Sequence, residues 1–187
     1  MPAENPNTLQ DILKAIQDKK LPPVHLWNPD FCGDIEMRIG RDGTWFYMGT
    51  PIGRKAMVKL FSTVLRLDDD GKYYLVTPVE KLGIKVDDAP FLAVEMVREG
   101  SGATQVLSFR TQTDDWVVAD KTHPIRFSFN VKTNEPSPYI LVRDNLEALI
   151  NRPLFYDLVA LAEHKKIGDK TVLEITSQGE VFRIGEL

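Results

Sequence analysis

The chain has 187 residues, enough for one medium domain or two small ones, and its 43% hydrophobic and 27% charged residues are typical of a globular protein with its own core. The 23 basic and 27 acidic residues give a net charge of −4, which argues against binding to long nucleic acid but allows a small anionic ligand in a local pocket. The single cysteine, Cys32, excludes an internal disulfide, and the sequence shows neither a signal peptide nor a long apolar run, so we expect a cytoplasmic protein without a membrane span.

The first part of the chain predicts two helices, a hairpin and a strand. Apolar residues recur at helical spacing after Thr8, a residue suited to cap a helix, in "TLQDILKAIQ". Prolines predict an extended linker over Leu21–Pro29. Alternating apolar residues with a central Asp-Gly turn predict a hairpin over Asp34–Gly49. An apolar stripe then predicts a helix over Arg54–Leu67, followed by a strand over Lys72–Pro78.

After Val86 the sequence is a series of strand-like runs joined by short turns, which is typical of an antiparallel meander. We expect strands at "FLAVEMVRE", "TQVLSFRT", "WVVAD", "IRFSFNV" and "PYILV", helices at "RDNLEALI" and "PLFYDLVALAEHKK", and a closing hairpin at "KTVLEITSQGEVFRIG". We therefore divide the chain into an N-terminal helix and linker (1–23), a first module of strands and a helix (24–85) and a C-terminal module (86–187).

A weak internal repeat links two of the predicted hairpins. Ile39–Gly49 aligns without gaps to Ile175–Gly185, with the first isoleucine, the turn glycine, a phenylalanine and the last glycine in common. This agreement has two interpretations. It reflects either a true duplication of a hairpin and helix unit or the turn glycine and aromatic residue that any two hairpins share.

The stretch "GTPIGRKAMVKLF" resembles a phosphate-binding loop but lacks its spacing. Three residues separate Gly49 from Gly53, and Ala56 stands where a hydroxyl residue is needed, so nucleotide hydrolysis is not indicated. The stretch predicts a turn into a helix, whose first free N–H groups attract anions. "GSGATQ" and "DDDG" likewise predict turns and not a dinucleotide or calcium site.

No residue pattern indicates a metal, a cofactor or a catalytic nucleophile. The three histidines, His25, His123 and His164, lie far apart in the sequence and lack ligand spacing. The adjacent pairs Asp87-Asp88 and Asp114-Asp115 would point to opposite faces of a strand, so each pair is poorly placed for joint acid and base catalysis.

Several segments in a fixed order resemble one bacterial family, known as domain of unknown function 1285. These segments are "GTWFYMGTPIGRKAMVKLF", "DGKYYLVTPVEKLGI", "DDAPF" and "PYILVRDNLEALINR". The resemblance implies an α+β fold of two small β-rich modules with a repeated hairpin and helix motif, the second module being similar to a pleckstrin-homology domain. It also implies a ligand site between the modules that suits a nucleotide-like molecule, and a role in signalling.

The resemblance, together with residue chemistry, gives a set of candidate ligand-binding residues: Trp45, Arg54, Glu80, Lys81, Asp88, Tyr139, Arg143 and Arg152. In this hypothesis Arg54 and Arg143 hold an anion while Lys81 adds positive charge. Glu80 or Asp88 orients a ribose or an arginine. An aromatic ring, from Trp45 or Tyr139, stacks on the ligand.

The sequence therefore favours a binding or sensing protein over an enzyme. We expect a small anionic, nucleotide-like ligand between the two modules, as part of signal transduction. One alternative is a protein–protein interaction module without a pocket. Another is a hydrolase or transferase that uses Asp88, Glu80 or His123, which would need two of these groups in one cleft.

Overall fold

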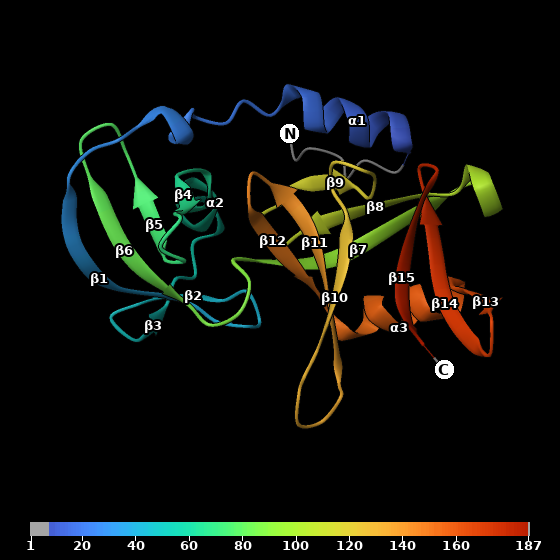
Figure 1. The fold of residues 1–187 in the computed structure, drawn as a ribbon. Coiled ribbons are helices and arrows are strands. Elements are labelled where there is room, and N and C mark those ends of the chain that lie inside the picture. The colour runs from blue at the N-terminus through green and yellow to red at the C-terminus, as the bar shows by residue number, and fades with distance from the viewer. Residues whose placement is uncertain (1–7, 187) are drawn as a thin grey trace.

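The computed structural model describes residues 8–186, which contain three α-helices and three β-sheets. The helices are α1 (Leu9–Asp18), α2 (Lys55–Thr63) and α3 (Arg152–Leu161), with short 3₁₀ turns η1 (Val24–Leu26) and η2 (Gly102–Thr104). The two predicted β-rich modules are present, and sheet dominates over helix (Figure 1). None of the helices in residues 8–186 is long and apolar enough to cross a membrane.

The first module is a six-stranded sheet that curls into a half-barrel (Figure 1). Its strands are β1 (Phe31–Ile39), β2 (Trp45–Tyr47), β3 (Thr50–Pro51), β4 (Leu65–Leu67), β5 (Tyr73–Val76) and β6 (Lys81–Val86). The strand order is β3-β2-β1-β6-β5-β4, and all neighbours are antiparallel except the central pair, β1 and β6. The predicted hairpin at Asp42-Gly43 is the β1–β2 turn.

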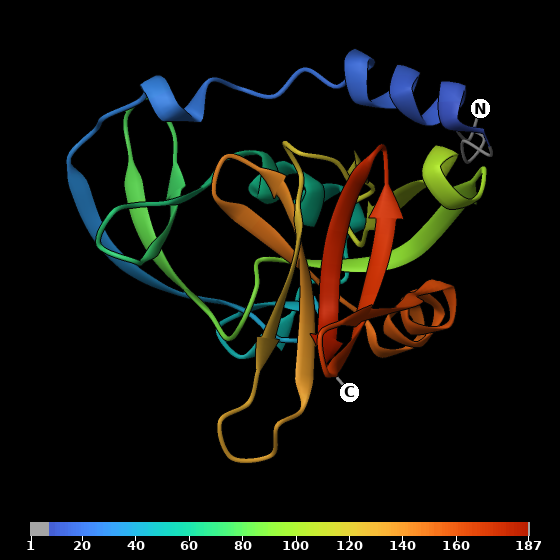
Figure 2. The same cartoon turned by 45° about the vertical axis from the view of Figure 1, so that its right-hand side comes forward.

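The second module has its own six-stranded sheet and a smaller three-stranded sheet. The strands of the large sheet are β7 (Phe91–Glu99), β8 (Val106–Thr111), β9 (Trp116–Val118), β10 (Ile125–Phe129), β11 (Pro136–Arg143) and β12 (Leu146–Ile150), in the order β10-β11-β12-β7-β8-β9. The small sheet contains β13 (Glu163–Ile167), β14 (Lys170–Ser177) and β15 (Glu180–Glu186). In Figure 2 it lies beside α3 at the C-terminal end of the molecule.

The two large sheets have the same strand topology. In each, the first and last strands pair in parallel at the centre, and three-stranded antiparallel meanders extend to both sides. The aligned segments Ile39–Gly49 and Ile175–Gly185 do not occupy equivalent places in this repeat. The first lies in the half-barrel and the second in the three-stranded sheet. Both contain a turn glycine at positive φ, Gly43 and Gly179, so a common turn geometry accounts for their likeness.

Three predicted helices differ from the observed elements. Arg143–Ile150 was predicted as a helix but forms the end of β11, a two-residue turn and β12, because Asp144 takes a left-handed conformation (φ 48°) that ends the strand sharply. The last predicted helix ends at Leu161, and the charged segment "EHKKI" is the exposed edge strand β13. Helix α2 ends at Thr63, and the apolar residues after it form β4.

One hydrophobic core joins the two modules. It includes Trp45 from the half-barrel and Phe91 and Phe109 from the second sheet, all almost fully buried. Such a continuous core fixes the modules against each other by close packing. The N-terminal arm, residues 8–28, crosses both modules: Ile12 of α1 packs on the second sheet, and Val24 of η1 packs on the half-barrel (Figures 1 and 2).

Candidate functional site

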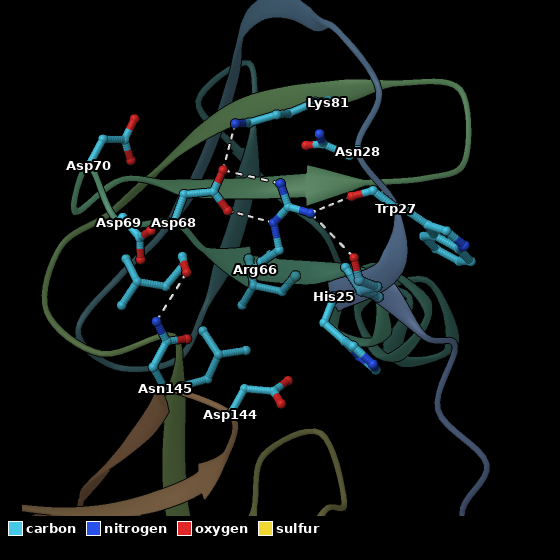
Figure 3. A pocket seen from close by; sticks show the side chains of 14 residues that line it. His25, Trp27, Asn28, Arg66, Asp68, Asp69, Asp70, Lys81, Asp144 and Asn145 are labelled. Carbon is cyan, nitrogen blue, oxygen red and sulfur yellow. Dashed lines mark hydrogen bonds and ion pairs between the residues drawn. The ribbon is translucent and has the colours of Figure 1, made fainter.

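One cavity, which we call the aspartate pocket, has a volume of about 860 Å³ and lies between the two modules (Figure 3). The N-terminal arm lines it with Val24, His25, Trp27 and Asn28, the half-barrel with Leu65–Asp70 and Lys81, and the second module with Asp144–Leu146 at the β11–β12 turn. The two modules touch at its lower edge, where the Asn145 side chain donates a hydrogen bond to the Leu67 carbonyl oxygen at 3.0 Å. The pocket is thus built from all three parts of the chain.

Its arginine and its lysine share one carboxylate. Arg66 and Lys81 both bind the carboxylate of Asp68, at 2.5 Å each, and Arg66 also donates to the Trp27 carbonyl oxygen at 2.7 Å. The hydrogen bond from Arg66 lowers the pKa of Asp68, aided by Lys81 and opposed by partial burial. Since Asp69, Asp70 and Asp144 also line the cavity, its charge disfavours an anionic ligand.

A second cavity, the arginine pocket, has a volume of about 650 Å³, and the charged residues that line it are two arginines and one carboxylate, that of Glu135. Arg41 reaches it from the β1–β2 turn of the half-barrel, and Arg152 lines it from the start of α3. Both side chains are exposed, at 62% and 66%. The remaining lining residues come from the second module: Glu135–Pro138, Leu149–Asn151, Phe155 and Tyr156.

Local sequence explains why Arg152 lies at the mouth of this pocket. Asn151 caps α3, with its side-chain oxygen accepting a hydrogen bond from the Leu154 N–H at 3.0 Å. Pro153 follows in the first turn, where its missing N–H costs no hydrogen bond. The positive end of the helix therefore adds to the charge of Arg152, although proline leaves one donor fewer for an anion.

Arg41 is held by two neighbours. Its guanidinium donates to the Ser137 hydroxyl at 3.0 Å and pairs with the carboxylate of Asp88 at 3.3 Å. Asp88 also accepts a hydrogen bond of 2.8 Å from the Tyr139 hydroxyl. Burial raises the pKa of Tyr139, and the hydrogen bond to Asp88 raises it further. Asp88 therefore connects the half-barrel to β11 beside the arginine pocket.

The structure does not bring the eight predicted site residues together. Arg152 lines the arginine pocket, with Asp88 and Tyr139 directly behind Arg41, and Lys81 lines the aspartate pocket. Arg54 and Glu80 are exposed and line neither cavity.

The side chains of Trp45 and Arg143 make packing contacts inside the protein and are not available to a ligand. The Trp45 ring is 1% exposed and stacks on Phe61 with centroids 6.3 Å apart, so it cannot reach a ligand. The guanidinium of Arg143 lies 4.9 Å from the Phe91 ring centroid and 3.6 Å from a carboxylate oxygen of Asp115, and it donates to the Ser62 carbonyl oxygen. Burial lowers the pKa of Arg143. This residue joins α2 to the second sheet.

The adjacent aspartates, including the catalytic candidate Asp88, are engaged in ion pairs, whereas the candidate Glu80 is exposed. Each adjacent aspartate has a cationic partner: Asp87 with Arg38, Asp88 with Arg41, Asp114 with Lys59 and Arg110, and Asp115 with Lys19. His123 lies 3.2 Å from Asp120 in the β9–β10 connection. Among residues 8–186, no group of His, Cys, Asp and Glu side chains could hold a metal ion.

Sequence reasoning missed Arg41, Glu135 and Tyr156. Arg41 precedes the Asp42-Gly43 turn, where an exposed charged residue is ordinary. Its approach to α3 depends on how the half-barrel packs on the second module, and no short motif encodes that packing. The exposed phenol of Tyr156 on α3 had no distinguishing signal either.

Comparisons with known proteins identify the family. Models of the N-terminal and C-terminal domains of DUF1285, a domain of unknown function, match residues 22–89 and 90–184. No curated protein matches the chain. A crystal structure of a DUF1285 family protein from Silicibacter pomeroyi is 50% identical, with 96% of each chain covered and a TM-score of 0.81. A second, from Shewanella baltica, is 28% identical, covers 66% of this chain and 90% of that one, and has a TM-score of 0.52. The resemblance in the sequence is thereby confirmed, and the chain belongs to the DUF1285 family.

Proposed function

We propose that this protein binds a small anionic, nucleotide-like ligand in the arginine pocket and acts as a sensor in signal transduction. The observation that carries this proposal is that Arg41 from the first module and Arg152 from the second line one cavity of about 650 Å³. That volume lies within the range of pockets for small molecules. A ligand there contacts both modules, so its binding is coupled to their packing.

The chemistry of the pocket matches a phosphate-bearing ligand with a flat group. Guanidinium groups bind phosphate or carboxylate through paired hydrogen bonds. The positive end of α3 points to the same anion. Phe155 and the exposed Tyr156 supply aromatic rings against which a base can pack. The likeness of the second module to a pleckstrin-homology domain stays a prediction, and anion binding rests on the pocket alone.

A thermal-stability screen against nucleotides and other small anions tests the proposal. A ligand at about 100 times its Kd adds roughly 2.7 kcal/mol to the free energy of unfolding, which is a measurable rise in Tm. We expect Arg41→Ala and Arg152→Ala to abolish that rise. Arg54→Ala is the matched control, because Arg54 is an exposed arginine at the start of α2 and lines neither pocket. A rise that survives in both pocket variants, or no rise with any anion, refutes the proposal.

A second candidate function, binding of a protein partner, is favoured by one face of α2. Leu60 lies within the apolar stripe of the helix predicted over Arg54–Leu67, yet it is 63% exposed, and Met57 on the same helix is 39% exposed. Helices bind to a groove or to a second helix through exposed apolar side chains that lie one turn apart. Replacement of both residues by serine would abolish capture of such a partner while leaving the Tm shift with anions unchanged. Loss of both properties would contradict a separate surface.

A further inference from the structure

The hairpin formed by β10 and β11 projects beyond the rest of the second sheet (Figures 1 and 2). Its strands pair from Ile125 with Ile140 to Phe129 with Pro136, and the loop between them holds its own shape. The Asn130 N–H donates to the Glu135 carbonyl oxygen at 2.9 Å, and the Asn134 N–H donates to the Asn130 carbonyl oxygen at 2.8 Å. At the tip, Val131 is fully exposed.

One ion pair connects the base of this loop to α3. The Glu135 carboxylate binds the guanidinium of Arg152, and both side chains are largely exposed, at 59% and 66%. Both residues line the arginine pocket. The carboxylate of Glu135 therefore occupies one guanidinium nitrogen of Arg152, Nη2, which an anionic ligand would need for a paired contact.

The two arginines of the pocket differ in how firmly they are held. Asp88, the partner of Arg41, is mostly buried and also binds Tyr139, so it is fixed by the packing around it. Glu135 lies on a solvent-exposed loop, and exposed pairs of this kind contribute little. A phosphate group carries more charge than a carboxylate and forms the same paired hydrogen bonds. The Arg152–Glu135 contact is thus the one that a ligand replaces.

We propose that Glu135 is an internal competitor of the anionic ligand, and that the ligand frees the loop of the β10–β11 hairpin, residues 130–135, from α3 when it takes Arg152. The strands of the hairpin stay in place, because Phe127 of β10 packs on Phe155 of α3. This inference rests on the proposed function of the arginine pocket. It makes Glu135 the residue that sets ligand affinity, and it makes the projecting loop the part of the molecule that responds. A partner would then read the presence of ligand from the position of the hairpin tip.

The test uses inorganic phosphate as the probe, titrated at constant ionic strength into the full-length protein and followed by NMR. Glu135→Gln retains size and hydrogen bonding but removes the charge, so we expect phosphate to bind about two- to five-fold tighter, as expected when a weak exposed pair is lost. Asp157→Asn is the matched control. It removes the same charge from an exposed position on α3 that does not line the pocket, and its affinity should equal that of the wild type.

Hydrogen exchange gives an independent readout. Phosphate should speed exchange of the amides in residues 130–135 of the wild type, whereas simple binding slows exchange. Equal affinity of the wild type and Glu135→Gln, or an equal gain in Asp157→Asn, overturns the competitor role of Glu135 and leaves the anion site standing. Slower amide exchange in residues 130–135 on addition of phosphate overturns release of the loop from α3. Phosphate binding that is absent, or unchanged by Arg152→Ala, overturns the site itself and this inference with it.

Discussion

The N-terminal arm offers a quantitative test of how the structure is held together. In helix α1 the side chain of Ile12 is fully buried and packs against Val106 and Val118 of the second sheet. Ile12→Ala removes three buried carbon groups, worth about 0.8 kcal/mol each, so docking of the arm should weaken by about 2 to 3 kcal/mol before any cavity is counted. A helix of ten residues is marginal when isolated, so an undocked α1 also unfolds.

The assay is hydrogen exchange of the α1 amides together with denaturant unfolding. A loss of about 2 to 3 kcal/mol corresponds to exchange of the α1 amides that is faster by about 30- to 150-fold. Leu13→Ala is the control, because it removes the same number of atoms from the next residue, whose side chain is 41% exposed. It should change exchange only a few-fold. Equal effects of the two substitutions would show that Ile12 does not anchor the arm, and the packing argument would be refuted.

Three further predictions concern the charged contacts. Arg143→Ala should lower the free energy of unfolding in urea by about 1 to 3 kcal/mol, because it removes the Arg143 donor from the Ser62 carbonyl oxygen and a cation that lies 3.6 Å from the buried Asp115 carboxylate; an effect as small as that of Arg54→Ala would contradict this. The hydrogen bond to Asp70 raises the pKa of Tyr74 to about 12, so its contribution to stability is present below pH 10, the ordinary tyrosine pKa, and is lost as the pH rises toward 12. Asp70→Asn should shift one tyrosinate absorbance step down toward pH 10, and an unchanged titration would be evidence against the bond. Because the pKa of Asp68 is lowered, its ion pairs stabilise the fold above the ordinary pKa of 3.8, and this stabilisation is lost as the pH falls below that value. Asp68→Asn should therefore make the free energy of unfolding less dependent on pH in acid. An unchanged slope would contradict the pairing.

Local patterns in the sequence were sufficient for elements whose burial follows a simple period. Helix α1 begins after Thr8, whose hydroxyl accepts a hydrogen bond from the Asp11 N–H as a cap does, and the β1–β2 hairpin turns at Asp42-Gly43. The helix predicted over residues 143–150 was wrong. Leucine, alanine and glutamate favour helices, but the structure buries this segment as β12, the strand beside β7. Tertiary context overrode propensity there, and it cannot be read from the segment itself.

For a related reason, the sequence predicted only part of the candidate site. The family resemblance and residue chemistry selected both Arg152, which lines the arginine pocket, and Arg143, which is a buried link between α2 and the second sheet. The difference between the two arginines is burial, which depends on packing across the modules. Lys81 is a second residue whose environment the sequence does not reveal. Its ammonium group pairs with Asp68, which the sequence presents as part of an ordinary turn.

Chain connectivity explains why the arginine pocket forms where it does. Strand β6 is the last strand of the half-barrel and β7 is the first of the second sheet, and residues 87–90 alone connect them. Asp88 lies in this connection, so it must stand at the junction of the modules whatever the surrounding loops do. Its carboxylate binds Arg41 from the first module and Tyr139 from the second. The position of Arg41 in the pocket is therefore tied to the packing of one module on the other, and a change in that packing would alter the arginine pocket directly.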